Sequence, residues 1–126
     1  MANNPLIIPL PTEVGGFISC VAHATYQQRV TVFLDDQELG VFQGTGENVK
    51  MTLANGRSVL SLPADGSASG VSFYFEFSTD GHSFQRATVE EPIKNVYGTA
   101  IQITVTSEDG ADSDDNDTYL TFTYSS

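Results

Sequence analysis

The stretch GVSFYFEF, residues 70–77, decides the fold class because its apolar side chains recur at every second position. This apolar series consists of Val71, Phe73, Phe75 and Phe77. A period of two is typical of a β-strand that buries one face, and aromatic and β-branched residues are favoured in strands. We therefore expect a strand here, with the three phenylalanines in the core rather than in a ligand-stacking platform.

The same alternation appears on both sides of this stretch. The clearest cases are residues 29–34, 99–106 and 118–124, and weaker ones lie near 15–23, 38–43, 48–53 and 57–62. Turn-forming pairs fall between the runs, namely Asp35-Asp36, Asn55-Gly56, Asp65-Gly66, Asp80-Gly81 and Asp109-Gly110. Of these, Asn55-Gly56 is the strongest hairpin motif. Short strands separated by regular turns predict an all-β fold, either an antiparallel sandwich or a barrel.

Length and charge limit the organisation and the partners. A chain of 126 residues is expected to form a single domain, residues 1–126. Five Lys and Arg residues stand against sixteen Asp and Glu residues, which gives a net charge of −11. Nucleic acids and anionic membranes require clustered positive charge, so we expect neither as a partner. Metal cations, neutral ligands and basic proteins remain as possible partners.

Cysteine usage and hydropathy bear on location. A lone cysteine, Cys20, excludes an internal disulfide framework and lies in an apolar stretch, where it is expected to be a buried hydrophobe. No apolar stretch approaches the roughly 18–20 residues of a membrane span, so membrane insertion is not expected. The N-terminus lacks the basic region of a Sec signal. We expect cytoplasmic synthesis, with any export or cell-surface display by a non-classical route.

The segment SEDGADSDDND, residues 107–117, departs from the strand pattern. It holds six of the sixteen acids, which are Glu108, Asp109, Asp112, Asp114, Asp115 and Asp117. Crowded carboxylates repel one another, and a loop with a strand at each end cannot spread to relieve that repulsion. A hard cation with several oxygen ligands would relieve it. Calcium suits the segment best because it accepts six to eight oxygens in irregular geometry.

Three other interpretations of this segment compete with a functional calcium site. An EF-hand is excluded, because Asp117 stands where that motif needs glycine and Thr123 where it needs glutamate. A solvated acidic loop is the usual meaning of a charge run, but Gly110 and Asn116 interrupt this run and strands confine it. The third interpretation, in which calcium binds only to order the loop, is left open by these physical arguments.

The segment also resembles the characteristic loop of the bacterial fucose-binding lectin II family, which comprises small calcium-dependent sugar-binding proteins. The shared pattern is Ser-Glu-Asp-Gly-x-Asp-x-Asp-x-Asn-Asp. Leu10-Pro11 matches a family Leu-Pro, and the segment from Gly15 to Ala22 follows without a gap. Residues 44–98 share the β pattern alone. The resemblance implies an antiparallel β-sandwich of about nine strands, of the Greek-key type.

The resemblance further implies two calcium ions side by side. Glu108, Asp112, Asp114 and Asp117 would hold the first ion, and Asp114, Asn116 and Asp117 the second. The four carboxylates would balance the charge of both ions. Vicinal hydroxyls of a monosaccharide would replace metal-bound water, and Asp109 would accept a hydrogen bond from one of them. No covalent bond changes.

The family has a second loop that contacts the ligands, and by resemblance it corresponds to His23-Ala24-Thr25-Tyr26 in this sequence. The main-chain carbonyl of His23 would contribute to the second calcium, and a backbone ligand tolerates the change from the usual Asn. Ala24 and Thr25 would tune the choice of sugar, and Ala in place of a hydroxyl side chain goes with a preference for mannose. Tyr26 is bulkier than the usual residue and would crowd or extend the site.

The end of the chain departs from the family. Members end in a glycine whose carboxylate reaches a calcium of the partner in a dimer, whereas this chain ends Tyr124-Ser125-Ser126, about one residue earlier. Either the Ser126 carboxylate reaches the sugar site by another path or the cross-subunit ligand is missing. The resemblance implies a homo-oligomer, either a dimer or a tetramer.

These observations predict a non-enzymatic, calcium-dependent lectin for mannose- or fucose-containing glycans. The alternative is a structural β-sandwich whose calcium orders the loop without sugar recognition, which the early chain end and Tyr26 favour. A hydrolase with paired carboxylates is disfavoured. Calcium lowers the pKa of the carboxylates that bind it, whereas an acid catalyst needs a raised pKa.

Overall fold

The structure is a computed structural model, and it describes residues 2–9, 15–62, 70–108 and 117–125. These residues form ten β-strands. In chain order they are β1 (Leu6–Pro9), β2 (Gly16–Leu34), β3 (Gln37–Lys50), β4 (Val59–Leu62), β5 (Gly70–Ser78), β6 (Gln85–Arg86), β7 (Thr88–Val89), β8 (Ile93–Tyr97), β9 (Ala100–Glu108) and β10 (Thr118–Ser125). The described ranges contain no helix able to cross a membrane.

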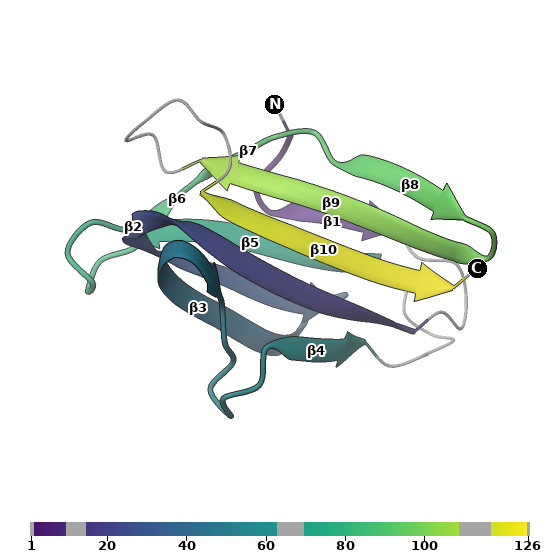
Figure 1. Cartoon of the computed structure of the whole chain (residues 1–126), viewed down its shortest axis with the longest axis horizontal. Coiled ribbons are helices and arrows are strands. Elements are labelled where there is room, and N and C mark those ends of the chain that lie inside the picture. The colour runs from purple at the N-terminus through teal and green to yellow at the C-terminus, as the bar shows by residue number, and fades with distance from the viewer. Residues whose placement is uncertain (1, 10–14, 63–69, 109–116, 126) are drawn as a thin grey trace.

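The strands form one hydrogen-bonded sheet that folds into two layers because β2 belongs to both. The order is β1-β5-β2-β10-β9-β7, with β3 and β4 also on β2, β6 on β5 and β8 on β9. The first half of β2, residues 16–22, pairs with β10, and the second half, residues 27–34, pairs with β5. In Figure 1, β9 and β10 lie in front of β1 and β5.

Side chains of the two layers meet in a common core. The ring of Phe73 on β5 meets the ring of Phe122 on β10 edge-on, with their centroids 6.1 Å apart. Every pairing between strands is antiparallel, and β10 returns to lie beside β2 after a long excursion, as in a Greek key. The predicted all-β antiparallel sandwich is confirmed, with ten described strands instead of about nine.

Most predicted strands are confirmed, with changed boundaries. Residues 57–62, 70–77, 99–106 and 118–124 correspond to β4, β5, β9 and β10. The separate strands expected at 15–23 and 29–34 are one continuous strand, β2, and those at 38–43 and 48–53 largely merge into β3. Alternation does not predict β1, β6, β7 or β8. The first three have two to four residues, and all five residues of β8 are exposed.

The predicted core residues are buried. Phe73, Phe75 and Phe77 belong to the core cluster, which confirms that they are not a ligand-stacking platform. Cys20 is also buried, and burial raises the pKa of its thiol well above the usual value. The thiol therefore stays protonated and unreactive, as expected of a small buried hydrophobe.

Three of the predicted turns lie among the described residues. Asp35 and Asp36 join β2 directly to β3 as a two-residue hairpin. Gly56 has a φ of +83°, which confirms a turn at Asn55-Gly56. The hairpin predicted there is wrong, because β3 and β4 on its two sides both pair with β2 instead of with each other. Asp65-Gly66 and Asp109-Gly110 lie outside the described residues.

The turn at Asp80-Gly81 is closed by the Asp80 side chain. Asp80 Oδ1 accepts hydrogen bonds from the hydroxyl of Ser78 and from the backbone N–H groups of His82 and Ser83, at 2.8–3.0 Å. These bonds favour the charged carboxylate, the two backbone bonds most strongly, and lower the pKa of Asp80 to about 2. Gly81 supplies the positive φ, +80°, that the turn requires.

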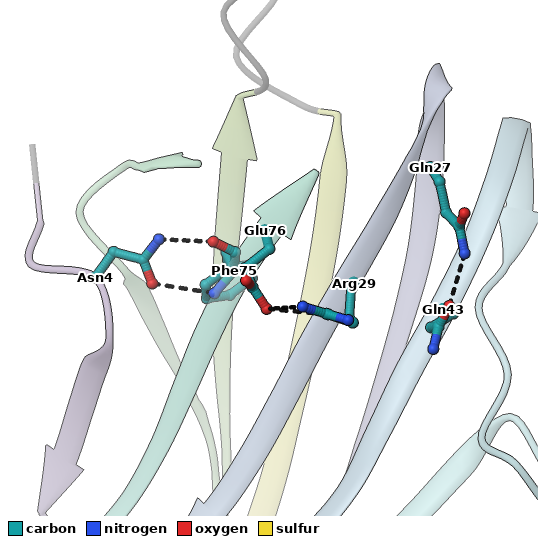
Figure 2. Close-up of polar contacts among 6 residues, drawn as sticks. All are labelled: Asn4, Gln27, Arg29, Gln43, Phe75 and Glu76. Carbon is teal, nitrogen blue, oxygen red and sulfur yellow. Dashed lines mark hydrogen bonds and ion pairs between the residues drawn. The ribbon is translucent and has the colours of Figure 1, made fainter. Parts of the chain in front are cut away.

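Polar side chains hold the segment before β1, and strand β2, against β5 (Figure 2). The Asn4 amide nitrogen donates to the carbonyls of Phe75 and Ala87, both at 2.8 Å, and Asn4 Oδ1 accepts from the N–H of Phe75 at 3.0 Å. On the next strand pair, the Arg29 Nε donates to Glu76 Oε1 at 3.0 Å. The Asn4 bonds hold the segment before β1 against β5 and against Ala87, the residue before β7.

Candidate functional site

One end of the sheet gathers the described residues of the acidic segment. Ala22, Thr118 and Ser107 lie side by side in one row across β2, β10 and β9. Glu108 and Asp117 lie one residue beyond this row, at the end of β9 and immediately before β10. The backbone N–H of Asp117 donates to the Ser107 carbonyl at 2.8 Å. The ladder thus fixes the backbone of both acids at the same end of the sheet.

The two acids are buried despite their charge. Glu108 is 8% exposed and Asp117 is 0% exposed. Burying a carboxylate is costly unless hydrogen bonds or a cation compensate. Carboxylate oxygens are ligands that calcium prefers, whereas zinc favours nitrogen and sulfur. The donor type therefore fits calcium, although no group of three or more His, Cys, Asp or Glu side chains able to hold a metal occurs within the described ranges.

Several predicted site residues have no described position. Asp109, Asp112, Asp114, Asn116 and Ser126 lie outside the described residues, as does Asp115. Ser125, the last residue of β10, lies at the opposite end of that strand from Asp117 (Figure 1). The described part of the predicted site therefore comprises Glu108 and Asp117 together with the segment that begins at His23.

The backbone of His23 lies directly beside Asp117. The His23 N–H donates to the Asp117 carbonyl at 2.8 Å. The imidazole is directed toward β3, where Nδ1 lies 3.2 Å from Glu47 Oε1, and its side chain is 23% exposed. The backbone and the ring of this residue therefore have separate surroundings, with the backbone facing the acidic segment.

The contact segment at residues 23–26 is not a loop, as the resemblance implied, but an irregular part of β2. Ala24 pairs with Gly46 and Gln28 pairs with Gly44, so β2 advances four residues while β3 advances two. This bulge leaves residues 25–27 outside the ladder with β3, although Gln27 still pairs with Ser78 on β5. Bulges re-aim side chains and are frequent beside functional sites. A strand can therefore present a contact segment here without being interrupted.

Side chains from neighbouring positions hold the bulge in place. Thr45 Oγ1 donates to the carbonyl of Thr25 at 2.9 Å, and Gln28 Nε2 donates to the carbonyl of Tyr26 at 3.2 Å. The Tyr26 ring stacks on Phe77 with centroids 6.3 Å apart. The bulk of Tyr26 is therefore packed on the core instead of standing free beside Ala24.

Gln28 is a residue of this region that the sequence analysis did not single out. Its side chain is fully buried, and its Oε1 accepts a hydrogen bond from the Thr118 hydroxyl at 2.9 Å. The alternation of apolar residues could have identified both Gln28 and Thr118. Gln28 is in phase with Val30 and Val32, and Thr118 is in phase with Leu120, so each places a polar group on an apolar face.

Solved structures share this fold. The Chromobacterium violaceum lectin CV2L, in complex with α-methyl-fucoside, is 18% identical with a TM-score of 0.73, over 97% of this chain and 96% of its own. The Ralstonia solanacearum high-affinity mannose-binding lectin is 20% identical with a TM-score of 0.71, over 97% and 96%. The C-terminal domain of the BC2L-C lectin from Burkholderia cenocepacia is 20% identical with a TM-score of 0.64, over 98% and 97%.

Sequence comparison gives the family. No curated protein sequence matches the chain significantly. The family model described as Fucose-binding lectin II (PA-IIL) matches residues 8–126, which include every strand from β2 to β10 and the whole acidic segment. By that match, the chain belongs to the fucose-binding lectin II (PA-IIL) family.

Proposed function

We propose that this chain binds mannose- or fucose-type monosaccharides through two calcium ions at the acidic end of the sheet. The observation that carries the proposal is the placement of two buried acids, Glu108 and Asp117, at one end of the sheet, where the Asp117 carbonyl accepts the N–H of His23. Membership of the family supports it. Two structural neighbours add support, since one is in complex with α-methyl-fucoside and the other is described as mannose-binding.

The ligand set follows the family pattern. Glu108, Asp112, Asp114, Asn116 and Asp117 would hold the two ions, together with the main-chain carbonyl of His23. Their four carboxylates match the charge of two divalent cations, which offsets the cost of burying acids. Bound calcium would supply coordination positions at which vicinal sugar hydroxyls replace water.

Neighbouring residues would orient the sugar. The Asp109 carboxylate would accept a hydrogen bond from a sugar hydroxyl, and such charge-assisted bonds are stronger than neutral ones. Ala24 offers a methyl group where a hydroxyl side chain would donate or accept, which we expect to favour mannose over fucose. Thr25 would contribute to the same edge, with its carbonyl already held by Thr45.

We infer a homo-oligomer, a dimer or a tetramer, in which Ser126 contributes to the site of a second copy. Within one chain, β10 places Ser125 eight residues from Asp117, or roughly 26 Å at strand spacing. A ligand from Ser126 would therefore serve another subunit. Light scattering in calcium measures the mass of the parent and of a Ser126 deletion, and calorimetry compares their sugar affinity; an unchanged mass and affinity in the deletion would contradict this contribution.

Calorimetry tests the function itself. Methyl α-mannoside and methyl α-fucoside are titrated into the protein in excess calcium and again after chelation with EDTA. Asp117→Asn keeps the side-chain shape and removes one buried charge. We expect it to weaken calcium-dependent sugar binding by about 10–100-fold or more, as loss of metal-site residues does. Asp36→Asn is the matched control, because it makes the same charge change at the exposed β2–β3 turn.

Each outcome separates the candidate functions. Sugar binding in calcium that disappears in EDTA supports the proposal, provided that Asp36→Asn behaves like the parent. Binding that survives complete chelation refutes calcium-mediated recognition. Calcium binding without heat from either glycoside supports the alternative, in which calcium only orders the loop.

A further inference from the structure

A buried hydrogen bond joins the acidic segment to the contact segment across 90 positions of sequence. The Thr118 hydroxyl donates to Gln28 Oε1 at 2.9 Å. Gln28 is 0% exposed and Thr118 is 1% exposed, and both lie on the inward face of their strands. This polar pair stands where the alternation of β2 and β10 otherwise places apolar side chains.

The pair has a contact with each half of the candidate site. Thr118 follows Asp117 directly in the chain, and the Asp117 carbonyl receives the His23 N–H. Gln28 ends the β2 bulge, and its Nε2 donates to the Tyr26 carbonyl at 3.2 Å. The amide of Gln28 therefore bridges the residue after Asp117 and the backbone of the bulge.

Stability alone gives little reason for a polar pair at this place. A buried hydrogen bond contributes only modestly to stability, and two apolar side chains of the same shape can replace both partners at almost no cost. A directional bond does something that apolar packing does not, because it fixes the distance and orientation of the groups that it joins. Here those groups are the backbone of the bulge and the strand that carries Asp117.

We propose that Gln28 and Thr118 are positioning residues for sugar recognition. They hold residues 24–26 in a fixed place relative to Asp117 before the ligand arrives. Preorganisation of this kind raises affinity because less motion has to be lost on binding. The inference rests on the proposed function, and it adds a pair of residues that touches neither sugar nor calcium.

Three variants test the pair: Thr118→Val, Gln28→Met and the double variant, all of which keep the side-chain volume nearly constant. Each single variant leaves a buried polar group without its partner and should be less stable to urea than the parent. The double variant removes the hydroxyl and the amide together, so the part of the loss that comes from their unmet bond should return, while the Tyr26 carbonyl still lacks its Gln28 donor. We expect the affinity for methyl α-mannoside in calcium to stay about 2–10-fold weaker in all three, which is the range of one hydrogen bond.

A second readout follows the hydrogen bond between the His23 N–H and the Asp117 carbonyl. The His23 amide should exchange with deuterium faster in the double variant than in the parent, while the amide of Phe122 in the core should keep its protection. A double variant with parental sugar affinity, or with unchanged His23 protection, would overturn the proposal. If Gln28→Met does not fold, Thr118→Val carries the test, because it removes a single hydroxyl.

Failure of the proposed function is recognised separately. A parent protein that binds neither glycoside in calcium refutes sugar binding, whatever the variants do. The exchange of the His23 amide still decides whether the pair holds the contact segment.

Discussion

Replacing Asn4 by alanine is expected to lower the free energy of unfolding by about 2 kcal/mol. The Asn4 side chain makes three hydrogen bonds to the backbone. Two join Phe75, at 2.8 and 3.0 Å (Figure 2), and the third joins the Ala87 carbonyl at 2.8 Å. The Phe75 carbonyl keeps a second donor, the N–H of Ala87 at 3.0 Å. Asn4→Ala therefore removes a partner from three backbone groups, and the Phe75 N–H and the Ala87 carbonyl account for the loss, at about 1 kcal/mol each.

Urea unfolding followed by far-ultraviolet circular dichroism measures this loss, in constant excess calcium so that ligand binding contributes equally. A loss of about 2 kcal/mol corresponds to a fall in Tm of roughly 8 °C for a chain of this length. Asn3→Ala is the matched control, since Asn3 is exposed and its truncation should cost less than about 0.5 kcal/mol. Equal losses for Asn3→Ala and Asn4→Ala would refute the reasoning.

Asn4→Asp sharpens the same test. At neutral pH a carboxylate oxygen would face the Phe75 and Ala87 carbonyls where the amide now donates, so the loss should be at least as large as in Asn4→Ala. Folding would raise the pKa of the introduced acid, so the deficit should shrink as the pH falls and the acid can donate again. A deficit that does not change with pH would show that the amide is not acting as a donor.

Two further predictions concern other parts of the fold. Asp80→Asn should be less stable than the parent at pH 7, and the difference should shrink between pH 3.8 and about 2. Folding lowers the pKa of Asp80 to about 2, so the advantage of its charged form is lost as the pH falls through that interval; thermal unfolding across this range checks it. Phe122→Leu should cost about 1–3 kcal/mol in urea unfolding, because Phe122 is fully buried against Phe73 and Tyr124. Removal of the hydroxyl by Tyr119→Phe, at a side chain that is 42% exposed, should cost less than about 0.5 kcal/mol, and equal costs would contradict the assignment of the core.

The fold class could be predicted from the sequence because most strands bury one face. The alternation in β5 and β10 identifies both strands, and their inward aromatic residues meet between the layers. The continuity of β2 could not be predicted in the same way. Residues 24–28 interrupt the apolar alternation, and they stay within the strand because the bulge against β3 absorbs the irregularity. Whether β2 continues through these residues therefore depends on its pairing with β3 as much as on its own sequence.

The sequence predicts which residues make up the candidate site, and that ligand set stays a prediction, whereas the contacts that support the site could not be predicted. The density of acids pointed to a cation, and the family resemblance named the individual ligands and the segment at His23. Neither source indicated the contacts of Glu47 with His23 or of Thr118 with Gln28. Such contacts join residues far apart in sequence, and they become visible only when the register of β2 against β3 and β10 is known.

The position of β10 has a consequence for biosynthesis. The strand lies between β2 and β9, yet its residues leave the ribosome roughly 100 positions after their partners at the start of β2. At typical elongation rates, the nascent polypeptide waits roughly 5–20 s for this strand. Throughout that wait, the edge of β2 that will receive β10 remains open to other polypeptides, as unpaired strands do, and the edge of β9 is exposed as well once residues 100–108 have been made. Maturation is therefore expected to finish after translation of β10, and the unfinished chain is the form most in need of chaperones.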